Sequence, residues 1–388
     1  MVNNKHLDIE FLEKKIISTK NRFKLSNQEN KELSKFFENK NILVIGASGS
    51  IGLKFSLKLI NYKFKRLYLL DKNENELAAL NRTVIKKVAN KKIEYICSDI
   101  NTIDISSFLS KNKINVYLNF AAIKHVRSQE NINSIKYMFS TNYENFFKMN
   151  YKSNYLRKIF CISTDKAAEP SSLMGVSKLM MEQKLKSIHK KYKNISVSSA
   201  RFANVSFSKG SILEHALESI IKKDLFGIPV NIKRYFITHE EAISICFQAL
   251  LKKNENSILI PNKEILGKQL YIQDIVSRVL KINNLTFTFV KKLKKKVNNK
   301  RYNILLSNNK ITGQKSKEIL FSNYEKKYLK KTNAATSKLM LKNLFNINIS
   351  KYKKMRELNN INEIHKFISK LVKGYSYKKN QVKVSKIV

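Results

Sequence analysis

Apolar residues follow two alternating patterns along the first two hundred residues of the chain. Short apolar runs, typical of buried strands, alternate with segments whose apolar residues recur every three or four positions, as on one face of a helix. The predicted strands cover residues 41–45, 66–70, 93–96, 116–120, 159–162 and 195–200, and the predicted helices cover 53–60, 74–88, 134–149 and 173–190. This alternation predicts an α/β fold in which residues 41–200 form a Rossmann-type, doubly wound parallel sheet.

The pattern differs on both sides of this region. Residues 1–40 have apolar positions at helical spacing and predict an N-terminal helical extension, whose second helix starts near Ser26 and which packs on the main domain rather than on a partner subunit. Residues 201–388 are expected to form a smaller substrate-binding lobe and a mixed C-terminal region. Part of 201–260 is expected to return to the main sheet. The legible motif of the C-terminal region is Ile-Thr-Gly-Gln-Lys at 311–315.

Composition supports a globular protein. Of 388 residues, 43% are hydrophobic and 27% charged. No apolar run approaches the roughly 20 residues that cross a bilayer, and the first residues lack the apolar core of a signal peptide, so we expect a cytoplasmic protein. Cys97, Cys161 and Cys246 lie far apart without metal-binding or disulfide spacing. Each is expected to be a small buried residue, and no metal site is predicted.

The net charge of +46 is spread along the whole chain. This distribution indicates a biased composition rather than a nucleic-acid surface, because the basic residues lack aromatic interleaving on a defined motif. The basic runs at 291–296 and 378–386 are expected to be solvated faces, with a weak membrane-surface patch as the alternative. A basic field also attracts anionic substrates such as a nucleotide diphosphate.

The first predicted strand runs into a glycine-rich turn. Its GxxGxxG spacing at the start of a helix lets backbone N–H groups approach a pyrophosphate. The second strand ends in Asp71, where a carboxylate can bind an adenosine ribose and favours NAD, whereas Lys72 would admit NADP. A capped helix start at Asp71 is the alternative reading. The predicted cofactor-binding residues are Gly46, Ser48, Gly49, Ser50, Ile51, Gly52, Asp71, Lys72, Asp99, Ile100, Ala121 and Ala122.

The densest group of acid and base residues follows the predicted strand 159–162. Ser163, Thr164, Asp165 and Lys166 occupy its carboxyl end, and the next helix carries Lys178. Open α/β sheets bind their ligands at the carboxyl ends of the strands. The sequence therefore predicts a functional site at this edge of the sheet.

Basic and amide side chains near the same edge are candidates for substrate binding. Lys124 and His125 follow the strand 116–120, and a structural histidine is an equal alternative for His125. Arg201, Asn204 and Arg234 suit hydrogen bonding to phosphate and uracil, because arginine presents a fork of donors; a surface salt bridge is the alternative for each arginine.

Six motifs together resemble a known family. They are 46–52, 121–126, 163–168, 174–178, 201–204 and 234–236. Their pattern is similar to extended short-chain dehydrogenase/reductases of the capsular-polysaccharide, UDP-N-acetylglucosamine 4,6-dehydratase type. The resemblance covers about 41–250, and the leader and the 312–315 motif resemble a subgroup linked to nonulosonic-acid and surface-glycan synthesis. The Ser-Thr-Asp-Lys-Ala-Ala stretch is highly specific, whereas the glycine spacing is not.

The resemblance implies an NAD(P)-dependent lyase that converts a UDP-N-acetylhexosamine, similar to UDP-N-acetylglucosamine, to a 4-keto-6-deoxy sugar nucleotide. The bound cofactor would take a hydride from C4 of the sugar and return it to C6. Lys166 would remove the C5 proton, Asp165 would protonate the departing C6 hydroxyl, and Lys178 would bind the nicotinamide ribose. The implied catalytic residues are Thr164, Asp165, Lys166, Met174 and Lys178.

Met174 departs from the wider superfamily, which has Tyr-x-x-x-Lys at this place. A thioether cannot take a proton, so the proton of the C4 hydroxyl is expected to leave to Lys166 or through Thr164 and water. Methionine is similarly found there in a branch of the dehydratase family. The alternative functions are a UDP-hexosamine 4-epimerase and a non-catalytic cofactor-binding scaffold, and a homo-oligomer is expected.

Overall fold

The structure, a computed structural model, describes residues 8–87, 92–125, 129–149, 151–291, 301–307, 318–348, 351–372 and 374–375. Within these ranges, a main sheet has the strand order β15-β16-β11-β6-β5-β4-β1-β2-β3. Its strands are β1 (Asn41–Ile45), β2 (Arg66–Asp71), β3 (Ile93–Cys97), β4 (Val116–Asn119), β5 (Lys158–Thr164), β6 (Ser196–Phe202), β11 (Ser257–Pro261), β15 (Leu329–Lys331) and β16 (Thr336–Met340).

The predicted doubly wound α/β fold is confirmed. Strand β1 pairs in parallel with β2 on one side and with β4 on the other, which gives the order 3-2-1-4-5-6 of a Rossmann sheet. Ile42, Leu43 and Val44 are completely buried. Strands covered on both faces require such continuous apolar runs, which is why the apolar pattern located them.

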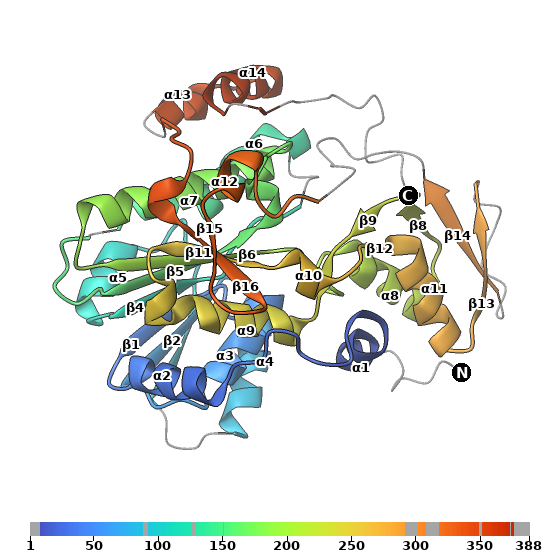
Figure 1. The fold of residues 1–388 in the computed structure, drawn as a ribbon, viewed down its shortest axis with the longest axis horizontal. Helices are drawn as coiled ribbons and strands as arrows, with labels where there is room; N and C mark the ends of the chain where they lie inside the picture. The colour runs from blue at the N-terminus through green and yellow to red at the C-terminus, as the bar shows by residue number, and fades with distance from the viewer. Residues whose placement is uncertain are drawn as a thin grey trace.

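Helices cover both faces of the main sheet (Figure 1). On one face lie α2 (Asn27–Phe37), α3 (Ser50–Leu59), α4 (Glu74–Ile85) and α9 (His239–Leu250). On the other lie α5 (Ile105–Lys111), α6 (Ile132–Asn142) and α7 (Leu173–Lys191). The predicted helix over 134–149 ends earlier, at Asn142, because Tyr143 leaves the helical conformation with φ −138°. A 3₁₀ turn follows at Glu144–Phe147.

The N-terminal segment joins the two parts of the molecule. Helix α1 (Ile9–Leu12) continues into a π-helical turn, Glu13–Ile17. Helix α2 begins after Ser26, which forms a capping box with Glu29 and so satisfies backbone N–H groups of the first turn. Leu12 packs in the apolar core of a second, smaller lobe, which is described next, whereas α2 packs on the main domain. The extension therefore spans both cores.

A smaller lobe lies beside the main sheet, at the right in Figure 1. It has its own apolar core, between α8, α11 and a three-stranded parallel sheet in the order β13-β14-β8. Short strand pairs, β7 with β10 and β9 with β12, lie where this lobe meets the main domain. The bounds are β7 (Asn204–Val205), α8 (Ile212–Lys222), β8 (Phe226–Pro229), β9 (Lys233–Arg234), β10 (Phe236–Ile237), β12 (Leu270–Tyr271), α11 (Ile272–Ile282), β13 (Thr286–Val290) and β14 (Arg301–Ser307).

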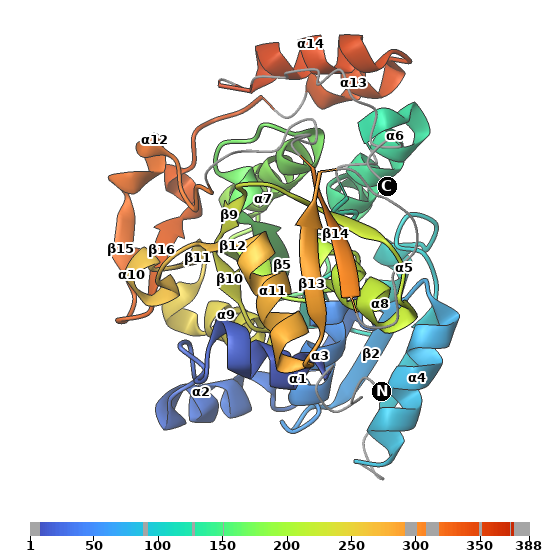
Figure 2. The ribbon, with the colours of Figure 1, turned by 90° about the vertical axis from the view of Figure 1, so that its right-hand side faces the viewer.

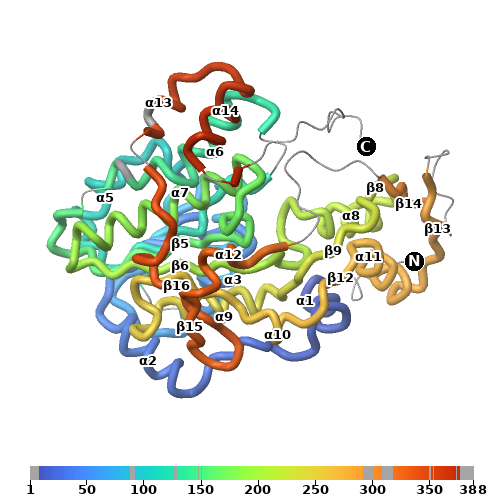
Figure 3. The backbone as a smooth tube through the Cα atoms, turned by 45° about the horizontal axis from the view of Figure 1, so that its top comes forward, coloured from blue at the N-terminus to red at the C-terminus, as the bar shows by residue number. Residues whose placement is uncertain are grey.

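The C-terminal region contributes directly to the main domain. Strand β11 pairs with β6, and β16 and β15 then extend the sheet as antiparallel strands. Figure 2 shows these two strands at the sheet edge opposite β2 and α4. Along the chain, α10 (Lys263–Leu266) and α12 (Asn323–Lys326) lie between β11 and β15, and α13 (Tyr352–Glu357) and α14 (Ile361–Leu371) follow β16. Helices α13 and α14 pack beside α6 and α7 (Figure 3).

The predictions for the cysteines are partly correct. Cys161 and Cys246 are buried, as expected, but Cys97 is exposed. Cys97 ends β3, the edge strand of the main sheet, where one side of the strand has no neighbour. Within the described residues, no helix has the length and apolar character needed to cross a membrane. Val126, the basic residues 292–296 and 378–386, and the 311–315 motif lie outside the described residues.

Arg201 lies in the interior of the protein, in β6, and is completely buried. Its guanidinium forms ion pairs with Glu182 of α7 at 2.6 Å and with Glu325 of α12 at 2.9 Å, and it donates to the carbonyl of Leu320 at 3.2 Å. A guanidinium enclosed in this way has no access to a ligand. The predicted substrate-binding role of Arg201 is therefore corrected to a structural one: it ties residues 320–325 to β6 and α7.

Replacement of Arg201 by alanine is expected to lower the free energy of unfolding by about 3–5 kcal/mol, because two carboxylates would remain buried without their cation. The matched control is Arg66→Ala, since Arg66 also pairs with a glutamate, Glu94, but is 46% exposed. That change should cost about 1 kcal/mol or less. Urea unfolding followed by circular dichroism measures both. Equal effects of the two substitutions would contradict this account of Arg201.

Candidate active site

The glycine-rich turn forms a close-packed cradle between β1 and α3. Gly46 has a φ of +72°, which favours glycine, and a Cβ on Gly46 would lie 2.6 Å from the Ala121 nitrogen. A Cβ on Gly52 would lie 2.0 Å from the Gly46 carbonyl oxygen. Gly49 is the N-cap of α3 and forms no side-chain cap. The first turn of α3 thus presents backbone N–H groups, and its position at the end of β1 fits a dinucleotide pyrophosphate.

Asp71 links the end of β2 to this turn. Its carboxylate accepts hydrogen bonds from the Ser48 N–H at 3.0 Å and from the Asn73 N–H at 3.1 Å. The N-cap of α4 is Asn73, whose side chain accepts from the Glu76 N–H. Asp71 is therefore free of the capping role that was its alternative reading, and it lies where a ribose-binding carboxylate is expected.

Lys72 and Asp99 are connected through Tyr137 of α6. The Lys72 ammonium lies 3.0 Å from the Tyr137 hydroxyl, and that hydroxyl donates to Asp99. The hydrogen bond with Tyr137 raises the pKa of Lys72, and nearby carboxylates act in the same direction. Ile100, next to Asp99, is buried. The sequence reading did not identify Tyr137, since nothing in a helical pattern marks which tyrosine faces a strand end.

The loop after β4 is held against α7 by one amide side chain. Asn142 accepts a hydrogen bond from the Ile123 N–H at 2.9 Å and donates to the Ile123 carbonyl at 3.0 Å and to the Ser177 hydroxyl at 2.9 Å. Ala121 and Ala122, in the same loop, are half-buried, and the Ala121 N–H donates to Asn119. This arrangement fixes the loop beside the glycine-rich turn.

Lys178 and Met174 lie one helical turn apart on α7. The Lys178 ammonium is buried and donates to the Ile162 carbonyl at 3.0 Å, and burial lowers its pKa to about 8. Met174 is 4% exposed and belongs to the apolar cluster between α6, α7 and α14. Lys178 thus lies directly behind the end of β5, whereas the methionine contributes mainly to packing.

Three consecutive residues bring an acid and a base together at the end of β5. Asp165 is buried, and its Oδ1 accepts from the Thr164 hydroxyl at 2.8 Å and from the Lys166 ammonium at 3.0 Å. About one third of the Lys166 side chain is exposed. Desolvation would lower the pKa of Lys166, but the charges of Asp165 and Glu318 outweigh it and raise this pKa above its ordinary value. The ammonium form of Lys166 is therefore favoured in the free protein.

Side chains from the second lobe and from the C-terminal region complete this group. The Asn204 carbonyl oxygen lies 3.5 Å from the Lys166 ammonium, and its amide nitrogen donates to Glu318. Arg234 Nε lies 3.4 Å from the same Glu318 carboxylate. The structure thus places Asn204 and Arg234 near the acid–base pair and adds Glu318, whereas the binding of phosphate and uracil by Asn204 and Arg234 stays a prediction. The sequence reading missed Glu318, whose only signal was its place shortly after the 311–315 motif.

Lys124 and His125 contact a loop of the second lobe, residues 208–210. The Lys124 ammonium lies 3.4 Å from the Ser208 hydroxyl, and the His125 ring lies so close to Gly210 that a Cβ there would be 2.2 Å from a ring carbon. The N–H of Lys209 donates to Ser50 at the start of α3. Loop 208–210 therefore joins the second lobe to both the glycine-rich turn and the loop after β4.

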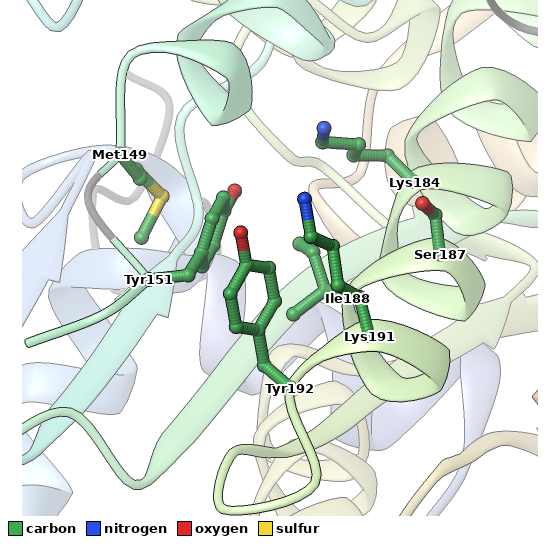
Figure 4. A pocket seen from close by; sticks show the side chains of 7 residues that line it. All are labelled: Met149, Tyr151, Lys184, Ser187, Ile188, Lys191 and Tyr192. Atoms are coloured by element: carbon green, nitrogen blue, oxygen red, sulfur yellow. The ribbon is translucent and has the colours of Figure 1, made fainter.

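A cavity of about 280 Å³ lies apart from these residues, at the C-terminal half of α7 (Figure 4). It is lined by Met149, Tyr151, Lys184, Ser187, Ile188, Lys191 and Tyr192. None of the predicted site residues is among them. The candidate site is instead the group of residues at the carboxyl ends of β1, β2, β4 and β5.

The strand order, the glycine cradle and the residues after β5 define the class of the protein, an extended short-chain dehydrogenase/reductase. Within this class the chain belongs to the family described as polysaccharide biosynthesis protein, whose model matches residues 42–361. The resemblance seen in the sequence motifs is thereby confirmed.

Two curated relatives and one solved structure are similar to this chain. The capsular polysaccharide biosynthesis protein CapD of Staphylococcus aureus is 27% identical over 271 residues, 65% of this chain and 42% of CapD. An inverting UDP-N-acetylglucosamine 4,6-dehydratase of Campylobacter jejuni is 24% identical over 240 residues, 58% of this chain and 67% of that protein. The UDP-glucuronic acid 4-epimerase of Bacillus cereus, solved with UDP-glucuronic acid and NAD, has a TM-score of 0.56 and 22% identity, covering 71% of this chain and 88% of that one.

These similarities differ in what they show. At 22% identity, the likeness to the solved epimerase shows the fold alone. The chain spans less than half of the length of CapD. The comparisons therefore show the family of the chain.

Substitution of Gly52 by alanine is expected to lower the free energy of unfolding by about 2 kcal/mol or more, because its Cβ would overlap the Gly46 carbonyl oxygen. Gly49→Ala is the matched control, since the nearest atom to its Cβ is 3.4 Å away, and it should cost about 1 kcal/mol or less. Urea unfolding followed by circular dichroism compares them. A tolerated Gly52→Ala substitution would show that the cradle is looser than described.

Proposed function

We propose that this protein is an NAD-dependent 4,6-dehydratase that converts a UDP-N-acetylhexosamine to a 4-keto-6-deoxy sugar nucleotide. The observation that carries the proposal is the contact between Lys166 and Asp165 at 3.0 Å, at the strand edge that also bears the glycine cradle. Dehydration of a sugar in this way requires one group that accepts a proton and one that donates a proton, both beside a hydride carrier. The dehydratase activity named for the Campylobacter jejuni relative supports the same reaction.

The residues of the cradle fit a dinucleotide, which would lie over the start of α3 with its adenosine ribose at Asp71. When bound, NAD would supply a hydride acceptor for C4 and a hydride donor for C6. The Lys72 ammonium is directed to Tyr137 and the nearby carboxylates, which leaves it poorly placed to neutralise a 2′-phosphate. This favours NAD over NADP. Lys178, behind the end of β5, would anchor the nicotinamide ribose.

Thr164, the last residue of β5, and the two residues after it can move every proton that the reaction requires. The cycle begins with neutral Lys166 and ionised Asp165. The C4 hydroxyl loses its proton through Thr164 to Asp165, along the hydrogen bond of 2.8 Å. Lys166 takes the C5 proton, which is acidic beside the C4 ketone, and Asp165 gives its proton to the departing C6 hydroxyl, which leaves as water. Return of a proton from Lys166 to C5 restores both groups.

In this route Thr164 and Asp165 take up the proton of the C4 hydroxyl, which is the role of the tyrosine in the wider superfamily. Met174 is buried among apolar side chains and takes no part in it. Asn204 and Arg234, beside Lys166, would bind oxygen atoms of the sugar nucleotide. Lys124 and the net charge of +46 would favour its two phosphates.

Incubation of the protein with UDP-N-acetylglucosamine and NAD, followed by mass spectrometry, is expected to show a product lighter by one water. Lys166→Ala should abolish both this product and solvent deuterium exchange at C5, because the base is lost. Lys342→Ala, which removes an exposed lysine, is the matched control and should leave both unchanged.

An unchanged mass with a new stereoisomer would instead identify a UDP-hexosamine 4-epimerase, which shares the oxidation at C4 but eliminates no water. Absence of turnover on several UDP-sugars, together with tight NAD binding, would identify a non-catalytic scaffold. Full exchange at C5 in Lys166→Ala would contradict the assignment of the base.

The rate of C5 exchange is expected to rise with pH across the neutral and weakly alkaline range, by up to about tenfold per pH unit. The reason is that the neutral form of Lys166 acts as the base, while Asp165 and Glu318 hold its pKa above the ordinary value. Deuterium incorporation at C5, measured between about pH 6 and about pH 9, tests this pH dependence. A rate that falls with pH would assign the limiting step to an acid instead.

A further inference from the structure

Glu318 is a buried carboxylate, and its hydrogen bonds and ion pair with other described residues lie at the candidate site. It is 7% exposed and comes from the C-terminal region rather than from the parallel sheet. One oxygen accepts from the Asn204 amide and lies 3.4 Å from Arg234 Nε, and the other accepts from the Tyr235 N–H at 2.6 Å. The acid–base pair of Asp165 and Lys166 does not include it.

The position of Glu318 is fixed from behind by the Arg201 ion cluster. Leu320, two residues further along the chain, gives its carbonyl oxygen to Arg201, and Glu325 forms an ion pair with the same guanidinium. Both contacts are buried. Glu318 is therefore held by two sets of contacts. Leu320 and Glu325 bind Arg201, and Glu318 itself contacts Asn204 and Arg234.

We propose that Glu318 is a positioning residue of the active site, which holds Asn204 and Arg234 in place beside Lys166 and sets the charge of that lysine. The reaction in which Lys166 takes part rests on the proposed function; the placement of the carboxylate does not. Asn204 has two ends, and Glu318 accepts from the amide nitrogen. This bond orients the amide so that its carbonyl oxygen faces the lysine.

The charged groups around this carboxylate are Asp165 and Lys166 after β5 and Arg234 on β9. Lys124 is also near enough to Lys166 for the two positive charges to act on each other. Desolvation and the charge of Asp165 raise the pKa of Glu318 to about 7, against the opposite effect of Lys166 and Arg234. As pH falls through this value, Glu318 takes up a proton and Lys166 loses one of the two carboxylates that favour its ammonium form. The charge of Lys166 is thereby coupled to the ionisation of Glu318.

Competitive labelling of the full chain with acetic anhydride, followed by mass spectrometry of the Lys166 peptide, measures the reactivity of that amine without any turnover. In Glu318→Gln the pKa of Lys166 should fall, because one of the two carboxylates that raise it is lost, so its labelling at about pH 8 should rise about tenfold. Glu264→Gln is the matched control, because Glu264 is exposed and distant in sequence from the site. The labelling of Lys166 in this variant should equal that in the unaltered chain.

Glu318→Asp is the second variant, because it keeps the charge but withdraws the carboxylate by one methylene. Its labelling of Lys166 should stay within about threefold of the unaltered chain. Its kcat on UDP-N-acetylglucosamine should fall about tenfold, since Asn204 and Arg234 lose their common partner. If Glu318→Gln does not fold, this variant alone decides: full activity with unchanged labelling would overturn the positioning role.

Two results separate this inference from its alternatives. Thermal destabilisation in Glu318→Gln with unchanged Lys166 labelling would mean a purely structural carboxylate, and would overturn the proposal. A tenfold rise in the labelling of Lys166 supports the proposal. If no sugar nucleotide is dehydrated, the proposed reaction is refuted, but the same rise in labelling still supports the electrostatic coupling of Glu318 and Lys166.

Discussion

The buried ion cluster of Arg201 with Glu182 and Glu325 is the interaction on which the arrangement of the site depends. A guanidinium without access to water is stable only with its carboxylates in place. Glu182 also accepts a hydrogen bond from Ser163, so the cluster reaches the last residues of β5. One enclosed charge thereby fixes α7, β6, the end of β5 and the segment that carries Glu318 relative to one another.

The acid–base group combines two requirements that oppose each other. A lysine that removes a proton must be neutral, yet carboxylates close enough to exchange protons with it stabilise its charge. In this site Asp165 is buried and Lys166 is one third exposed. A bound sugar would cover the exposed part of the lysine and desolvate its ammonium, which favours the neutral amine. Under the proposed function, substrate binding and activation of the base would be linked by the same change in solvation.

The sequence was sufficient where structure is determined locally. The apolar run of β1, the glycine cradle and the Thr164–Lys166 stretch are each defined by neighbouring residues, and the regular alternation of strands and helices predicts the doubly wound parallel sheet. The role of Arg201 and the presence of Glu318 could not be predicted in this way. Each depends on a partner more than a hundred residues away: 124 residues separate Arg201 from Glu325, and 114 separate Asn204 from Glu318. An arginine at a strand end has the same local pattern whether it binds a phosphate or a distant glutamate.

The late position of the C-terminal strands has a consequence for the order in which the protein becomes complete on the ribosome. Residues 320–340 are synthesised long after β6 and β11. Until they arrive, the parallel sheet ends in an open edge at β11, and Arg201 lacks one of its two carboxylates. The nascent chain therefore has a free pairing edge and an incomplete ion cluster at the same time. The arrival of residues 320–340 removes both features, because β16 then pairs with β11 and Glu325 reaches Arg201.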